Sequence, residues 1–136
     1  MGAWTVWARV LFAGLLVLVT YFTLVPDPSA ASKGIAIARW IADVIFRGAV
    51  SHDKVEHFMA YTALGATAYL AQFRLFNSRY SAPIALALYG GILEIMQGIG
   101  GVRDPELADG AANTLGAIAG YGGMFLLASL FRARAA

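Results

Sequence analysis

The chain has 136 residues, of which 60% are hydrophobic and 13% are charged, with a formal net charge of +2. A soluble domain normally carries about 25% charged residues, so this composition is typical of a membrane protein instead. The few basic residues are scattered, which disfavours nucleic acid as a partner. The absence of cysteine excludes disulfides and thiolate metal sites, and the length indicates one domain covering residues 1–136.

The first apolar segment, residues 4–25, is predicted to be a transmembrane helix. As a helix it extends about 33 Å, which exceeds the roughly 30 Å of hydrocarbon in a bilayer. Trp4, Trp7 and Tyr21 lie near its ends, where amphipathic rings favour the headgroup level. A cleaved signal peptide is the competing interpretation, because small residues follow at 29–31. The apolar run is long for such a peptide, so a retained helix is favoured.

A Pro-Asp-Pro sequence at 26–28 is expected to end this helix. Residues 35–48 then repeat at helical spacing, with Arg39, Asp43 and Arg47 on one stripe and apolar side chains opposite. Because the segment is too short to cross a bilayer, it is predicted to be an amphipathic helix in the membrane interface. It acts either as a lid over a polar site or, in the plainer interpretation, as a packed surface connector.

Three more transmembrane helices are predicted, over residues 54–73, 82–99 and 110–131. The predicted fold is therefore all-α, a polytopic membrane bundle of four transmembrane helices plus one interfacial helix. Both chain ends and the turn after the second span are predicted to lie on one side of the membrane. This side carries more basic residues than the opposite side, once Lys54 and Arg103 are assigned to local acidic partners. This asymmetry favours both termini in the cytoplasm.

The predicted topology places one end of each of the second, third and fourth spans on the same side of the membrane. Polar residues gather at these three ends. The second span carries several of them on a single helical face, and the third and fourth spans each carry a pair. Polar residues in spans usually face the bundle interior and mark function. The sequence therefore predicts one polar site on the outer face, formed by Asp53, Lys54, His57, Tyr61, Glu94, Gln97, Arg103, Asp109 and Asn113.

Glu94 is the most informative of these residues, because it lies about 6 Å inside the end of its span. A bare carboxylate there is costly, so Glu94 is expected to pair with Lys54 or Arg103, or to be protonated. The alternative is a buried network that only locks the helices together. Gln97 and Asn113 are weaker signals, because amides between helices more often join them than perform chemistry.

Acidic residues outnumber Lys54 and Arg103 around this site, which favours a protonated His57, a neutral Glu94 or a bound cation. His57, Glu94 and Asp109 offer ligands for a divalent metal. A single histidine with mixed carboxylates is nevertheless a weak metal signature, so no metal or other cofactor is expected.

The same residues resemble a known family. The pattern consists of Asp53-Lys54-x-x-His57 with Tyr61, then Glu94-x-x-Gln97, then Arg103 followed by Asp109, Asn113, Gly116 and Gly120. It is similar to the pattern of the VanZ-like family of small bacterial membrane proteins. That family takes its name from an accessory factor in resistance to the glycopeptide teicoplanin. The resemblance covers about residues 53–120 and implies a multi-pass protein of the bacterial inner membrane with a role at the cell envelope.

Two functions are consistent with this pattern. In the first, the site binds a lipid, a lipid-linked cell-wall precursor or a glycopeptide-type ligand without turnover, and contributes to glycopeptide resistance; partner proteins are not indicated. In the second, the protein is a membrane-embedded enzyme that modifies a headgroup. Arg103 and Lys54 would then hold a phosphate or carboxylate, His57 and Glu94 would exchange protons, and Asp109 would orient His57 or Arg103.

Overall fold

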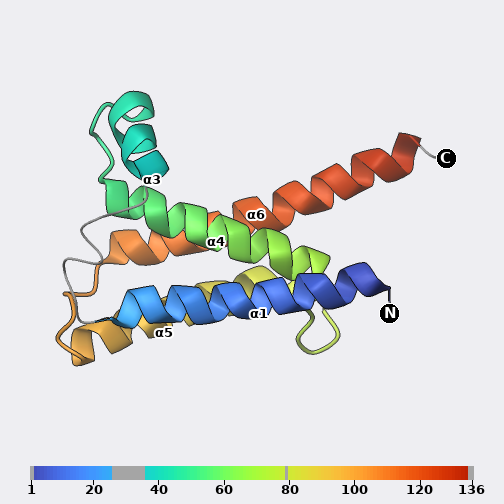
Figure 1. Cartoon of the computed structure of the whole chain (residues 1–136), viewed down its shortest axis with the longest axis horizontal. Helices are drawn as coiled ribbons and strands as arrows, with labels where there is room; N and C mark the ends of the chain where they lie inside the picture. Colours follow the sequence, from blue (N-terminus) through green and yellow to red (C-terminus); the bar gives the residue numbers. More distant parts are fainter. Residues whose placement is uncertain (1, 26–35, 79, 135–136) are drawn as a thin grey trace.

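The computed structural model describes residues 2–25, 36–78 and 80–134, and it places these residues in helices joined by short turns (Figure 1). The all-α prediction is confirmed. The long helices are α1 (Ala3–Leu24), α4 (His52–Leu70), α5 (Ser81–Ile99) and α6 (Leu107–Arg134), and a short α3 (Ala36–Trp40) continues into a π-helical turn, η1 (Ile41–Ile45). The predicted helix end at 26–28 and the small residues at 29–31 lie outside the described residues.

Three of these helices, α1, α5 and α6, are long and apolar enough to cross a membrane. They correspond to the predicted spans at 4–25, 82–99 and 110–131, and the structure therefore supports a membrane protein. Helix α4 is long enough to cross a membrane, but it is not apolar enough, because the charged residues Asp53, Lys54 and Glu56 lie in its first two turns.

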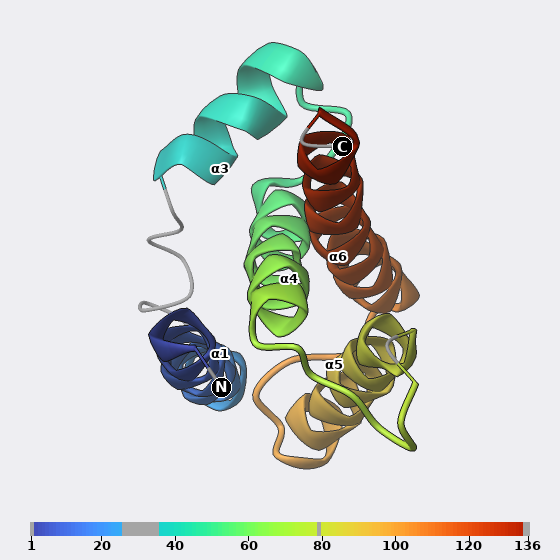
Figure 2. The same cartoon turned by 90° about the vertical axis from the view of Figure 1, so that its right-hand side faces the viewer.

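Helix α4 lies in the middle of the bundle, with α1 and α6 at its sides and α5 near both (Figure 2). Its inward face contributes Tyr61, Leu64 and Ala68 to the main core, where all three are buried. The rest of that core comes from α1, α5, α6 and the turn after α4, through Phe12, Ala71, Ala82, Leu86, Ala117 and Tyr121. Many large apolar side chains of α1, α5 and α6 point outward instead, as expected for helices that face lipid.

The contact between α4 and α6 depends on glycine. A methyl group on Gly116 or Gly120 of α6 would collide with the backbone carbonyl of Phe58 or Thr62 on α4, respectively. From the other side, a methyl group on Gly65 would meet the backbone of Ala117. Glycines at the Gly116-x-x-x-Gly120 spacing are typical of closely packed membrane helices, and here they let the two backbones touch.

The predicted amphipathic segment at 35–48 forms α3 and η1 and ends at Arg47 and Gly48, which have positive φ angles of 50° and 74°. It packs against α4 through small residues: Ala38 and Ala42 are buried beside Val55. The large apolar side chains Trp40, Val44 and Ile45 of this segment are exposed. The segment therefore presents an apolar surface away from the bundle.

The start of α4, the end of α5 and the start of α6 lie together at one end of the bundle (Figure 1). The start of α1 and the end of α6 point toward the opposite end. Antiparallel connection of the helices thus collects the polar ends of three helices at one level, as the sequence predicted.

Replacing Gly120 with alanine is expected to lower the thermal stability of the protein in detergent. The added methyl group meets the Thr62 carbonyl and must force α4 from α6, and overpacking of this kind costs about 1–3 kcal/mol. Gly122→Ala is the matched control on the same helix, because no atom of the described residues lies within 4 Å of a methyl group there. Thermal unfolding followed by fluorescence should give a lower Tm for Gly120→Ala only. Equal Tm values for the two variants would contradict the close contact.

Candidate functional site

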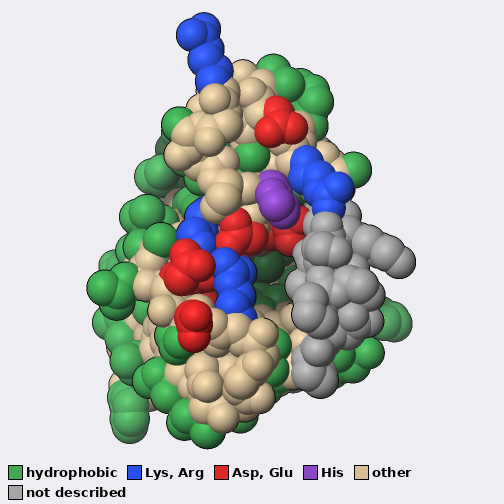
Figure 3. Space-filling view, turned by 90° about the vertical axis from the view of Figure 1, so that its left-hand side faces the viewer, with side chains coloured by type: hydrophobic (Ala, Val, Ile, Leu, Met, Phe, Trp, Pro, Cys, Tyr) green, Lys and Arg blue, Asp and Glu red, His purple; other side chains and the backbone are tan. Residues whose placement is uncertain are grey.

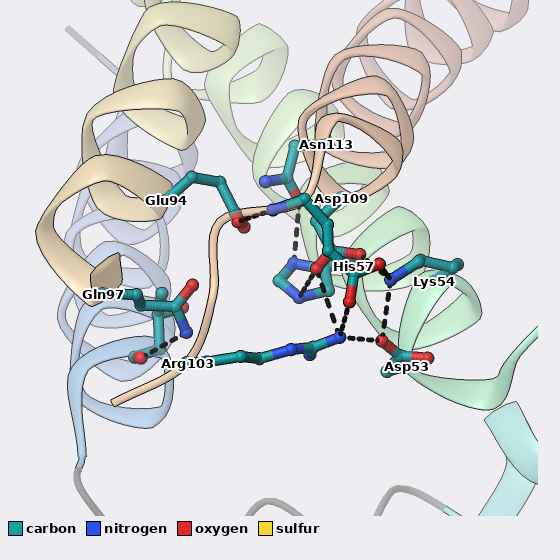
Figure 4. A network of polar contacts seen from close by, with 10 residues as sticks. Asp53, Lys54, His57, Glu94, Gln97, Arg103, Asp109 and Asn113 are labelled. Atoms are coloured by element: carbon teal, nitrogen blue, oxygen red, sulfur yellow. Dashed lines mark hydrogen bonds and ion pairs between the residues drawn. The ribbon is translucent and has the colours of Figure 1, made fainter. Parts of the chain in front are cut away.

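The site is built around the carboxylate of Asp109, which is 1% exposed in the first turn of α6. Its Oδ1 lies 2.6 Å from Nζ of Lys54, and its Oδ2 lies 3.5 Å from Nη2 of Arg103 (Figure 4). An acid in the first turn of a helix is also favoured by the helix dipole. The buried charge is therefore balanced by two cations and by the helix terminus.

Two further acids complete this arrangement. Asp53 lies 3.0 Å from Lys54 and 2.6 Å from Arg103, and Glu106 lies 2.5 Å and 3.0 Å from the same two cations. We call these five side chains, Asp53, Lys54, Arg103, Glu106 and Asp109, the ion-pair network. It ties the first turn of α4 to the loop between α5 and α6, and acidic and basic groups gather at this end of the surface (Figure 3).

The two loop residues of the network have shifted pKa values. Hydrogen bonds from Lys54 and Arg103 hold the pKa of the Glu106 carboxyl below its ordinary value of 4.5. The hydrogen bond to Asp53 raises the pKa of Arg103 above its ordinary range. Both groups therefore remain charged at neutral pH, and the network persists as a set of ion pairs.

His57 lies on the inner side of the network and is oriented by α6. Its Nδ1 is 3.0 Å from Oδ1 of Asn113, and an amide oxygen can only accept, so Nδ1 donates the proton. In the neutral ring the lone pair is then on Nε2, which lies 3.9 Å from Oδ2 of Asp109. Asn113 is itself buried, so this orientation is held within the bundle.

Glu94 approaches the same region from α5 and is 6% exposed. Its Oε2 accepts a hydrogen bond of 3.5 Å from the backbone N–H of Glu106, and its Oε1 is buried without a hydrogen-bond partner among the described residues. The ion pairs of Lys54 and Arg103 go to the network acids instead, so the expected pairing of Glu94 with one of these cations is not observed. One ligand atom each of Glu94, His57 and Asp109 lies within 4.8 Å of the others.

Two predicted site residues, Gln97 and Tyr61, take no part in the ion-pair network or in the group formed by His57, Glu94 and Asp109. Nε2 of Gln97 donates to the backbone carbonyl of Thr23 at 2.7 Å and so links α5 to α1. The hydroxyl of Tyr61 is buried in the core without a hydrogen-bond partner in the described chain, near the amide of Asn113 and the bare Cα of Gly90. The structure brings together the other seven predicted residues: Asp53, Lys54, His57, Glu94, Arg103, Asp109 and Asn113.

Glu106 was counted among the acidic residues around the site, but the sequence prediction did not name it as a site residue. It precedes α6 by one residue and contacts both Lys54 and Arg103. The available signal was its spacing, three residues after Arg103 and three before Asp109. That spacing brings side chains to one side of the chain only if the loop turns as a helix does.

An apolar groove of about 710 Å³ opens beside the network, between α5 and α6. Its walls are mostly small or apolar residues, and Glu94 and Glu106 are the acidic residues that line it. Ile95, Leu107 and Leu115 border the groove and are exposed, so it is accessible from the side of the bundle as well as from the polar end. The other lining residues are Ala87, Gly91, Pro105, Gly110, Ala111 and Thr114.

No protein family model, curated protein or solved structure matches this chain. The function is therefore argued from the geometry of the site.

The Glu106→Gln variant is expected to be less stable than the wild type at neutral pH and equally stable in acid. The ion pairs lower the folded-state pKa of Glu106, so its stabilisation is complete above the ordinary value of 4.5 and is lost as the pH falls through the lower folded-state value. Tm values of both proteins between pH 7 and pH 3 measure this difference. Asp104→Asn, at an exposed acid of the same loop, is the control and should track the wild type. A Glu106→Gln deficit that did not shrink in acid would contradict the ion-pair assignment.

Proposed function

We propose that this protein is a multi-pass membrane protein that binds a lipid or lipid-linked molecule, with the chain of that molecule in the α5–α6 groove and its headgroup at the polar site. The observation that carries the proposal is the position of Glu94. This residue lines the apolar groove and also lies within 4.8 Å of the ligand atoms of His57 and Asp109. An amphiphile is the kind of molecule that uses both surfaces at once.

The groove has the properties of a binding site for an acyl or isoprenoid chain. Its volume of about 710 Å³ falls in the range of small-molecule pockets, roughly 300–1,000 Å³. Its exposed border residues, Ile95 and Leu115, lie on helices that are long and apolar enough to span a membrane. A lipid chain can therefore enter sideways from the bilayer and displace no ordered polar group.

The chemistry of the polar end favours a headgroup that donates hydrogen bonds. Lys54 and Arg103 each already contact three carboxylates, so a phosphate would have to compete with Asp53 and Glu106 for them. Glu94, in contrast, has an acceptor oxygen without a partner in the described chain. Hydroxyl and amine groups, as in sugar-linked or ethanolamine headgroups, satisfy such an acceptor.

The proposed placement in the membrane has four spans. We propose that α4 crosses the bilayer because it is buried in the bundle centre and its charges sit at one end, where the ion pairs compensate them. The α3–η1 segment lies in the interface with Trp40, Val44 and Ile45 toward lipid. Both termini are then cytoplasmic and the polar site faces outward. The resemblance to the VanZ-like family supports a bacterial inner membrane protein with a role in glycopeptide resistance.

A second candidate function is headgroup modification. The specific observation in its favour is the proximity of His57, Glu94 and Asp109, which provides a proton acceptor and donor beside the groove. Mass spectrometry of envelope lipids and cell-wall precursors separates the two functions. A changed species that depends on His57 indicates an enzyme, whereas altered glycopeptide sensitivity with unchanged lipids indicates a binder.

Filling the groove is expected to abolish lipid binding without disturbing the fold. Gly91 lines the groove and has open space around its Cα, so Gly91→Leu places a side chain in the cavity. Native mass spectrometry of the purified protein should show a bound lipid for the wild type and at least a tenfold lower bound fraction for Gly91→Leu. Gly123→Leu, at a glycine with equally open surroundings outside the groove, is the control. Equal lipid occupancy in both variants would contradict the proposed site.

The four-span topology predicts that the two ends of α4 lie on opposite sides of the membrane. Because the chain has no cysteine, single substitutions report their own accessibility. Ala49→Cys and Phe76→Cys occupy exposed positions before and after α4. In intact spheroplasts an impermeant maleimide should label Ala49→Cys at once and Phe76→Cys only after permeabilisation. Labelling of both cysteines from the outside would show that α4 does not cross the membrane.

A further inference from the structure

We propose that His57, Glu94 and Asp109 form a binding site for one divalent transition-metal ion of the zinc class. The residues come from α4, α5 and α6, respectively, and one ligand atom of each lies within 4.8 Å of the other two. Ligand atoms around a tetrahedral zinc ion lie about 3.4 Å apart, from bond lengths of about 2.0–2.1 Å. An ion would therefore need to draw these side chains together by little more than 1 Å.

The orientation of His57 is the first observation that supports the site. Histidines that bind metals almost always donate the second ring N–H to a carbonyl, carboxylate or water, which fixes the tautomer. His57 does this through Nδ1, which donates to Oδ1 of Asn113 at 3.0 Å. The lone pair on Nε2 then faces Asp109 at 3.9 Å, a distance too long for a direct hydrogen bond.

The second observation is the buried oxygen of Glu94. This side chain is 94% buried, from its exposed fraction of 6%, and points toward His57 and Asp109 (Figure 4). Its Oε1 has no hydrogen-bond partner in the described part of the chain. A buried acceptor without a partner is costly, and a metal ion bound between the three side chains would satisfy it.

The charge of the surroundings also suits a dication. The acids Asp53, Glu94, Glu106 and Asp109 supply four negative charges, while Lys54 and Arg103 supply two positive ones. With a neutral His57 the region keeps two negative charges, which one divalent ion balances. Lys54 contacts Oδ1 of Asp109 at 2.6 Å, whereas Oδ2, which lies 3.9 Å from Nε2 of His57, has a longer contact of 3.5 Å with Arg103. Oδ2 is therefore the less tightly held oxygen and the one that a metal ion would bind.

Three protein ligands leave a coordination position open, as in catalytic zinc sites. Because Glu94 also lines the α5–α6 groove, that position can be reached from the groove. The metal site is defined by the protein alone and does not depend on the proposed lipid. A bound metal ion would supply positive charge for binding an anion, whereas Lys54 and Arg103 are already paired with carboxylates.

Metal binding is tested on the full-length protein in detergent, purified without an oligohistidine tag and stripped with a chelator. Co²⁺ serves as the spectroscopic probe and Zn²⁺ as the competitor, with no lipid added. We expect one Co²⁺ per chain with visible absorption bands of a four- or five-coordinate ion, displacement by Zn²⁺, and a rise in Tm on adding Zn²⁺. Because no lipid is present, the result stands independently of the lipid-binding test.

The variants identify the ligands. His57→Ala and Glu94→Gln should each weaken Co²⁺ binding at least tenfold, and Asn113→Ala, which keeps all three ligands, should weaken it about 10–100-fold by releasing the His57 ring. His52→Ala is the matched control, because His52 is an exposed histidine at the start of the same helix. Wild-type protein that shows neither the absorption bands nor the Tm rise overturns the inference, even if a variant fails to fold. Loss of binding in His52→Ala alone overturns it as well.

Discussion

The buried carboxylate of Asp109 is the constraint on which the rest of the structure depends. Two cations from different parts of the chain approach it, Lys54 from the start of α4 and Arg103 from the loop between α5 and α6. Removing one partner of such a group leaves an uncompensated buried charge, which costs about 3–5 kcal/mol. The start of α4, the α5–α6 loop and the start of α6 are thereby held in one arrangement, and the site is a consequence of that arrangement.

Close packing of α4 on α6 acts together with this electrostatic constraint. Because Gly116 and Gly120 have no side chains, the backbones of the two helices touch, and residues one turn earlier on α6 come within hydrogen-bonding distance of α4. The contact between Asn113 and His57 is of this kind. A larger residue at either glycine would therefore disturb the orientation of His57 as well as the stability of the bundle. Packing in the apolar part and chemistry at the polar end are coupled through one pair of helices.

The sequence predicted the helical parts of the site well, because helical periodicity determines which residues share a face. It placed Asp53, Lys54 and His57 on one face of a helix, and all three lie at the site. The loop between α5 and α6 has no such periodicity, so the direction of Arg103 was not predictable, and Glu106 was counted among the surrounding acids without being assigned a contact. That loop directs Arg103 toward Asp53, which is why Glu94 contacts a backbone amide instead of a cation. The sequence also predicted a span over residues 54–73, but α4 is not among the helices that are apolar enough to cross a membrane, because charged residues lie in its first two turns.

The saturation of both cations changes the chemistry that the sequence suggested for this site. The number of charged residues in the sequence is the same whether Arg103 is free to hold a phosphate or bound to acids, and only the geometry distinguishes the two. Here the guanidinium contacts Asp53, Glu106 and Asp109, so the region as a whole attracts positive charge or hydrogen-bond donors. Glu94 lies where this acidic region meets the apolar groove, and its buried Oε1 has no hydrogen-bond partner among the described residues. Any anionic headgroup must therefore arrive with a cation, or find one already bound beside His57.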